Sequence, residues 1–276
     1  MATRTSLTGV VVALLGILLA LYQTGVWFGN SEPAEKAPLI IGRNNTVLFL
    51  FAEHHGFANV NLAAALSLQQ RHPQVEVHAA SFAVARARVG RVSTGPRPIT
   101  FHEVKGANFV ESLEAHGINT TTLIHRPGLR GSLPLFEQIP QTMSPWSVED
   151  HIAIYQQVRR LIDQVDPAII VLDIMFRPAT EAVEDSNRMH VVLTPNDLSP
   201  MLAPVQPYGQ VFWKYPVFAS GFAFPVPWRN VPENVLMFFK STYAILFPPG
   251  LGEKRRRLRE EGGIRNPLDF TQQRRD

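Results

Sequence analysis

The chain has 276 residues, 45% of them apolar, and a formal net charge of only +3 at neutral pH. This length and composition suffice for one large domain or two small ones with a buried core. The chain contains no cysteine, which excludes disulfides, thiolate nucleophiles and cysteine-based zinc sites. Its basic residues gather in two separate clusters, at 86–97 and 254–259, which favours solvated helix faces and no nucleic-acid partner.

The amino-terminal segment is strongly apolar. Leu7–Phe28 contains no charged residue, and a helix of about 20 apolar residues spans a bilayer core. We therefore predict that residues 1–30 form a single-pass membrane anchor. A cleaved signal peptide is the alternative interpretation, because the purely apolar part is short enough for one.

The residues after this segment bear on its orientation. Residues 31–44 contain two prolines and are predicted to be a linker. Two glycosylation motifs, Asn44-Asn-Thr46 and Asn119-Thr-Thr121, fit a body that lies in a lumen. We predict a membrane protein of the endoplasmic reticulum with its body on the lumenal side.

The stretch from Thr46 to Arg71 predicts a strand, a loop and a helix. The strand is the β-branched and aromatic run Thr46–Phe51. The loop carries two adjacent histidines, His54 and His55, and Asn59 is expected to cap the helix that follows. In a parallel α/β sheet such a loop lies at the carboxyl edge, where ligands bind.

Strands and helices alternate along the following residues. Central strands buried on both faces are continuous apolar runs, and Ala168–Leu172 is one, with Asp173 directly after it. This alternation predicts an α/β, Rossmann-like, doubly wound and mostly parallel sheet. The expected strands are 46–51, 75–80, 99–104, 168–172 and 191–193, and the expected helices are 59–71, 108–116, 147–165 and 179–188.

Two proline-rich segments interrupt the alternation. Residues 126–146 are predicted to be a loop, and residues 195–232 combine many prolines with many aromatic residues. The second segment is either a loop packed over the sheet or the apolar wall of a cleft. A helix is expected at Asn234–Phe247, and residues 251–276 form a charged tail.

Several segments resemble fungal UDP-glycosyltransferases (the UDP-glucosyl/glucuronosyltransferase family). They are Glu53-His-His-Gly-Phe-Ala-Asn59, Val171-Leu-Asp-Ile-Met-Phe176, Trp213-Lys-Tyr-Pro216 and Ser220-Gly-Phe-Ala-Phe-Pro-Val-Pro-Trp228. The resemblance extends in order over residues 45–265. Its last two segments are more specific than the histidine loop.

The resemblance implies the amino-terminal half of a GT-B fold, in which residues 45–250 form the acceptor-binding domain. Members of this family are inverting, metal-free transferases that use a UDP-sugar as co-substrate. By position, His55 is the base that deprotonates the acceptor hydroxyl, and Asp173 orients it. We assign contact with a small-molecule or lipid acceptor to His54, Phe57, Asn196, Trp213 and Tyr215.

The chain also departs from this family. His54 adjoins His55, so either could be the base. No donor-binding box is present, and residues 251–276 would lead to an absent donor domain, which predicts that this chain alone binds no cofactor. The chain would then be a fragment, a truncated product or a true half-protein. Two other functions remain open, a non-catalytic membrane-anchored half that recruits a donor-binding subunit, and a module that binds lipids or small apolar molecules.

Overall fold

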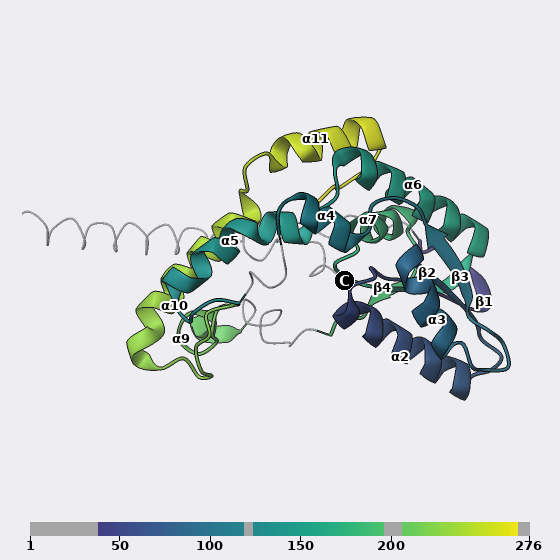
Figure 1. Cartoon of the computed structure of the whole chain (residues 1–276), viewed down its shortest axis with the longest axis horizontal. Coiled ribbons are helices and arrows are strands. Elements are labelled where there is room, and N and C mark those ends of the chain that lie inside the picture. The colour runs from purple at the N-terminus through teal and green to yellow at the C-terminus, as the bar shows by residue number, and fades with distance from the viewer. Residues whose placement is uncertain (1–37, 119–123, 196–205, 270–276) are drawn as a thin grey trace, which may run out of the picture. The chain divides into compact units, whose positions relative to one another are not determined.

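The computed structural model describes residues 38–118, 124–195 and 206–269, and its centre is a five-stranded parallel sheet (Figure 1). The strand order is β3-β2-β1-β4-β5. The strands are β1 (Arg43–Leu50), β2 (Glu76–Phe82), β3 (Thr100–Val104), β4 (Pro167–Leu172) and β5 (His190–Val192). The chain builds outward from β1 on one side and then returns to add β4 and β5 on the other. The doubly wound, Rossmann-like sheet predicted from the sequence is therefore confirmed.

The central strand β1 is buried on both faces. It pairs in parallel with β2 and with β4. Leu48 and Leu50 point into one apolar core, whereas Val47 and Phe49 point into the other. A strand that is covered on both sides needs apolar side chains at successive positions, which explains the continuous apolar run in the sequence.

Helices cover the two faces of the sheet (Figure 1). One core takes its helical residues from α2 (His55–Arg71) and α3 (Arg86–Val92), and the other takes them mainly from α4 (Phe109–Ala115), α6 (Val148–Val165) and α7 (Arg177–Ser186). On α6, Ile154, Val158 and Ile162 recur every four residues and are fully buried. Short 3₁₀ turns lie at Ala83–Ala85, Pro207–Gly209 and Trp228–Asn230.

The expected helices at 108–116 and 147–165 are present, and a side chain caps the beginning of each. The Ser147 hydroxyl accepts a hydrogen bond from the backbone N–H of Asp150 at 3.0 Å, and Asn108 caps α4 through a full capping box with Glu111. The predicted cap at Asn59 is wrong. Helix α2 begins at His55, because the loop residues already form its first turn, in which Ala58 N–H donates to the His54 carbonyl.

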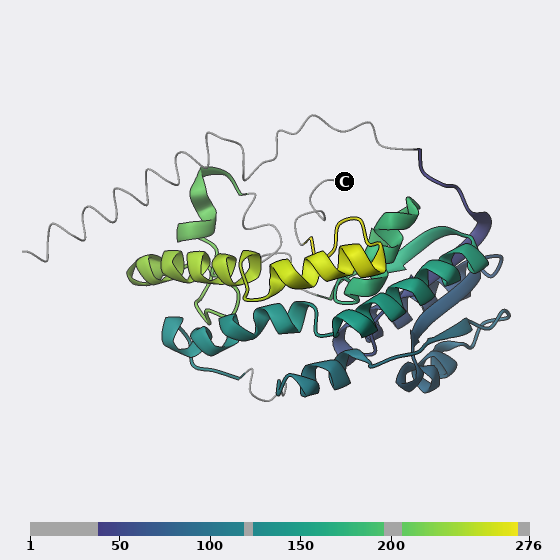
Figure 2. The ribbon, with the colours of Figure 1, turned by 90° about the horizontal axis from the view of Figure 1, so that it is seen from above.

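The predicted loop at 126–146 is also wrong, because it contains the helix α5 (Leu129–Met143) with Pro134 and Pro140 inside it. Prolines in a helix interior disfavour that helix by several kcal/mol, so local propensity argued against it. Tertiary packing prevails here. α5 lies along α10 (Val231–Leu246) in both views of the ribbon (Figures 1 and 2), and its residues Phe136 and Ile139 are buried.

The carboxy-terminal part of the chain is folded as far as it is described. The short helix α9 (Gln210–Trp213) precedes α10, which matches the helix predicted at 234–247 to within three residues. The segment expected as a charged tail begins with α11 (Leu251–Gly262). Leu258, Ile264 and Leu268 are buried in the core that α6 and α7 share, so the folded body extends beyond residue 250.

The membrane predictions fall outside this description. The predicted anchor at 1–30 and the first half of the linker at 31–44 precede the described residues, and β1 already begins at Arg43. Among the residues that are described, no helix combines the length and the apolar character needed to span a bilayer.

Candidate functional site

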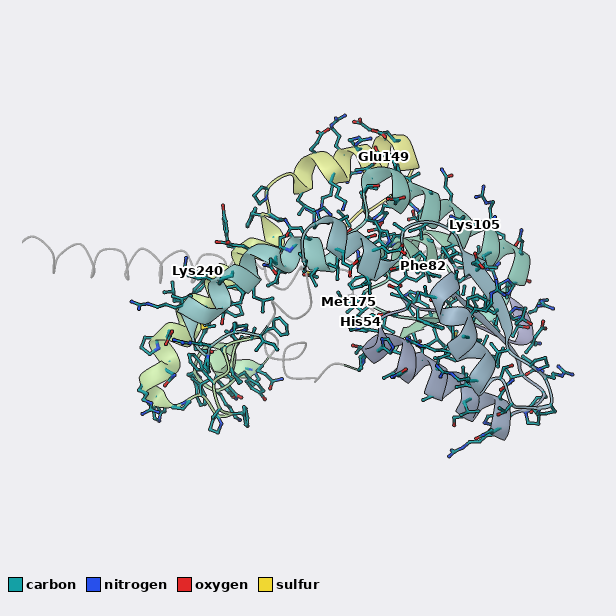
Figure 3. The ribbon with its side chains drawn as sticks, in the orientation of Figure 1. His54, Phe82, Lys105, Glu149, Met175 and Lys240 are labelled. Carbon is teal, nitrogen blue, oxygen red and sulfur yellow. The ribbon has the colours of Figure 1, made fainter. Side chains whose placement is uncertain are left out.

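Two neighbouring strands bring the predicted site residues to one edge of the sheet. The loop after β1 and the residue after β4 meet where the strand order changes direction, which is the usual ligand site of a doubly wound sheet. The backbone N–H of Ala52 donates to Oδ2 of Asp173 at 3.1 Å. Figure 3 labels His54 and Met175, which come from these two strand ends.

Asp173 is fully buried and is held by the backbone. Its Oδ1 accepts from the N–H of Met175 at 2.9 Å, and its own N–H donates to the carbonyl of Leu50. Burial raises the pKa of Asp173 to about 7, and the nearby charge of Glu53 adds to this rise, whereas the two amide hydrogen bonds oppose it. Asp173 can therefore gain or lose a proton near neutral pH.

Glu53 is a second buried carboxylate at this edge, which the sequence analysis did not select. Its two oxygens accept from the backbone N–H groups of Phe109, at 3.3 Å, and Val110, at 2.9 Å. These are free amides at the beginning of α4, where a negative charge is favourable. The Glu53 carbonyl accepts from Arg88 at 2.9 Å. Glu53 thus joins the β1–α2 loop to both α4 and α3.

His54 is half-buried beside aromatic rings. Its ring centroid lies 5.9 Å from that of Phe57 and 6.2 Å from that of Phe109. Its Nδ1 atom is buried and has no hydrogen-bond partner among the described residues. A buried polar atom without a partner is uncommon in a folded protein.

His55 is the first residue of α2 and is exposed to solvent. The structure brings His54 and His55 to the same sheet edge as Asp173, as the topology predicts. It does not join them, because among the described residues the Asp173 carboxylate accepts hydrogen bonds from the backbone amides of Ala52 and Met175. The predicted His–Asp pair is therefore not a hydrogen bond in this structure.

The residues assigned to the acceptor are dispersed. Phe57 lies beside His54, whereas Asn196 falls outside the described residues. Trp213 stacks on Trp228, with ring centroids 6.2 Å apart and planes 5° from parallel, and Tyr215 contacts Phe224. In the described part of the chain, neither Trp213 nor Tyr215 has a hydrogen bond or a ring contact with a histidine of the β1–α2 loop.

The chemistry available at this edge is proton transfer. This edge of the sheet carries the exposed imidazole of His55, the half-buried imidazole of His54, whose Nδ1 has no partner among the described residues, and the carboxyl group of Asp173, whose pKa is raised to about 7. Such groups suit a general base and a residue that orients it. Within the described ranges, no cluster of three or more histidine, aspartate or glutamate side chains could hold a metal ion.

No protein-family model matches the chain. A search of curated proteins finds a glycosyltransferase, sdnJ, from the fungus Sordaria araneosa, which is 26% identical over 213 residues. The match covers 71% of this chain and 41% of that protein, so the chain spans about two fifths of the length of this relative. The resemblance to fungal glycosyltransferases is thereby confirmed.

A search of solved structures also finds glycosyltransferases. The glycosyltransferase VinC in complex with dTDP is 17% identical, with 55% of this chain and 35% of that chain covered and a TM-score of 0.38. A UGT transferase from Siraitia grosvenorii in complex with UDP is 14% identical, with 71% and 38% covered and a TM-score of 0.35.

Proposed function

We propose that this chain is the acceptor-binding half of an inverting glycosyltransferase, which transfers a sugar from a UDP-sugar to the hydroxyl group of a small-molecule or lipid acceptor. The observation that carries the proposal is the meeting of the histidine loop and Asp173 at the carboxyl edge of β1 and β4. The sequence similarity to a fungal glycosyltransferase supports the reaction class.

In this proposal His55 is the general base. It is exposed at the beginning of α2, where an acceptor can reach it. The imidazole takes the hydroxyl proton as the acceptor oxygen bonds to the anomeric carbon of the sugar. The bond from that carbon to the diphosphate breaks at the same time, and UDP departs with the electron pair.

Asp173 is the positioning residue for that imidazole. Each carboxylate oxygen has two acceptor positions, and the backbone amides of Ala52 and Met175 use one on each. A further position is thus available for an imidazole N–H once the acceptor has ordered the loop. Ionised Asp173 would then fix the histidine tautomer and stabilise the imidazolium.

Donor binding is assigned to a second domain or to a separate subunit. Among the described residues, the G-x-G sequence Gly250-Leu-Gly252 begins α11 and does not follow a strand, so it does not match a phosphate-binding turn. Acceptor contact is assigned to Phe57, Trp213 and Tyr215, together with Asn196 and His54.

The test pairs this chain with the donor domain of a related transferase and measures sugar transfer. His55→Ala should reduce turnover by roughly 10²–10⁴, the usual contribution of a positioned base. Asp173→Asn should also reduce it, and the double variant should match His55→Ala, because Asp173 acts only through the imidazole. His54→Ala should reduce turnover much less than His55→Ala, because His54 is assigned to acceptor contact and not to proton transfer. Loss of activity in His54→Ala with retention in His55→Ala would reassign the base, and retention in both would reject the mechanism.

We also propose that residues 1–30 anchor the protein in the membrane of the endoplasmic reticulum, with the body in the lumen. The support is the uncharged run Leu7–Phe28 in the sequence. The full chain should remain in the membrane pellet after alkaline carbonate extraction, and its glycosylation motif at Asn44 should carry an endoglycosidase-sensitive glycan. Recovery of the intact chain in the supernatant would reject the anchor, and a product shortened near Gly29 would indicate a signal peptide.

A further inference from the structure

The segment that contains α9 and α10, residues 206–247, exposes an unusual amount of aromatic surface; we call it the aromatic segment. The side chains of Leu236 and Tyr243 on α10, and of Phe247 directly after it, are exposed. Leu236 and Tyr243 are seven residues apart, which places them on one side of the helix, and Phe247 follows four residues later. Tyr243 is 66% exposed and Phe247 is 64% exposed. Exposed apolar side chains that gather on one side of a helix mark sites that bind proteins or membranes.

The residues just before α10 also expose aromatic side chains. Trp228 is 79% exposed and stacks on Trp213, and Phe218 and Phe224 are exposed as well. Tryptophan and tyrosine have an apolar body and a polar tip, so they are suited to the boundary between lipid and water.

The charges of the aromatic segment are cationic. Residues 206–247 contain Lys214, Arg229 and Lys240 but a single acidic residue, Glu233. Glu233 is turned toward α5, where its carboxylate accepts from the N–H of Leu129 at 2.7 Å. Among the described residues, no ion pair involves any of the three cations. Lys240, which Figure 3 labels, is exposed on α10 and lies between Leu236 and Tyr243 in the sequence.

We propose that the exposed side of α10, together with Trp228, rests on a membrane surface that contains anionic lipid. A helix that lies in the membrane interface combines apolar and aromatic residues with lysine and arginine. Lys240 lies within the exposed stripe of α10, and its long side chain can bring the ammonium group to the headgroups while its apolar stem stays with the stripe. The cations complement the charge of anionic headgroups, which attract basic side chains within a Debye length of the surface. A folded protein partner with acidic groups or a second copy of the chain is the competing occupant.

The proposal rests in part on the proposed anchor, because the uncharged run Leu7–Phe28 would hold the body near the bilayer. It is independent of the transfer reaction. It also predicts a defined orientation, with α10 toward the lipid and the sheet body exposed to water. The sheet body comprises the strands β1–β5 and the helices that cover them.

The absence of native cysteines permits a test on the full chain. Single cysteines at Tyr243 and Trp228 are labelled with a fluorescent probe, and the protein is reconstituted in vesicles of phosphatidylcholine and phosphatidylserine that contain nitroxide-labelled lipid. Val84→Cys is the control, since Val84 is also an exposed apolar residue but lies in the sheet body.

Emission from the probes at 243 and 228 should fall by about half or more, because an interfacial helix lies at the level of the headgroups. Emission from position 84 should change little. The variant with Arg229→Glu and Lys240→Glu should reduce the quenching at 243, and so should high salt.

Vesicle flotation separates this proposal from the anchor. If the chain floats with the vesicles but the probes at 243 and 84 are quenched equally or not at all, the anchor is present and the proposed surface is wrong. A chain that does not float overturns both. Cross-linking between cysteines at 243 of two copies, without quenching by lipid, would identify a dimer interface and also overturn the proposal.

Discussion

Apolar residues have different surroundings in the sheet body and in the aromatic segment. In the body, Leu50, Leu172 and Phe176 are fully buried between the sheet and its helices. In the aromatic segment, Trp228, Tyr243 and Phe247 are mostly exposed. The aromatic segment is at least as apolar in sequence as the body, so hydrophobicity alone does not decide whether a residue belongs to a core.

The two regions are also held together differently. The body is held by two apolar cores, whereas a buried amide adds three hydrogen bonds to the packing of the residues before α10. Asn234 donates from Nδ2 to the carbonyls of Phe212 and Tyr215, both at 3.0 Å, and accepts at Oδ1 from the N–H of Val217 at 2.9 Å. The aromatic segment can thus be ordered by polar contacts while its aromatic rings remain available to a partner.

The largest expected difference between the two regions concerns phenylalanine. Phe176→Ala should lower the free energy of unfolding by about 3–5 kcal/mol, because it opens a cavity in a close-packed core next to Phe82 and Trp146. Phe247→Ala should change it by about 0.5 kcal/mol or less, since the ring is already in water. Urea unfolding followed by circular dichroism measures both. Equal effects would show that Phe247 is covered in solution and would remove the distinction between the regions.

The comparison also separates what the sequence could predict from what it could not. The five strands and the helices α2, α4, α6 and α7 were predictable from local sequence, because β1 and β4 are continuous apolar runs and α6 has apolar residues at helical spacing. The short helix α3 (Arg86–Val92) was not among the expected helices. Helix α5 was not, because Pro134 and Pro140 argue against a helix and only packing against α10 supports it. Likewise, the start of α2 depends on a first turn formed by residues that have a loop-like composition.

The site was predictable in its position but not in its bonding. A strand-end Asp173 and a histidine loop at the same sheet edge follow from topology. The role of Glu53 was not predictable, since its partners on α4 lie 56 and 57 residues away in the sequence. The one signal in the sequence is the position of Glu53, between the end of an apolar strand and the histidine pair.

An intermediate effect is expected at Asn234. Asn234→Asp keeps the shape and the acceptor for Val217 but replaces the Nδ2 donor with an oxygen that faces two carbonyls. Leaving buried polar groups unsatisfied should lower the free energy of unfolding by about 1–3 kcal/mol. Amide hydrogen exchange should accelerate at Val217 and in its neighbours but not in β1.

Asn230→Asp is the matched control for this change. Asn230 is half-buried at the beginning of the same helix and accepts a bond from Arg229 through its side-chain oxygen, which aspartate retains. It should therefore leave the exchange rates nearly unchanged. Slower folding or faster exchange throughout the sheet in Asn234→Asp would mean that the aromatic segment and the body unfold as one unit, contrary to the difference described above.

The smallest expected effect is that of Glu53 on Asp173. Burial raises the pKa of Asp173 from 3.8 to about 7, and the charge of Glu53 is the smallest contribution to that rise. Between those two values the folded protein binds a proton that the unfolded chain has lost, so stability should fall as the pH rises through this window. Glu53→Gln removes one negative charge and should lower the pKa of Asp173 in the folded protein. The pH range over which stability falls should then end at a lower pH. Infrared spectroscopy measures this through the carbonyl stretching band of protonated Asp173, which is assigned as the band that Asp173→Asn lacks. As the pH rises, this band should disappear at a lower pH in Glu53→Gln than in the native chain. Glu103→Gln removes the same charge from the surface, where Glu103 pairs with Arg86, and should leave that band unchanged. An unshifted band in Glu53→Gln would show that burial alone sets the titration of Asp173, and that Glu53 only holds α4 to the β1–α2 loop.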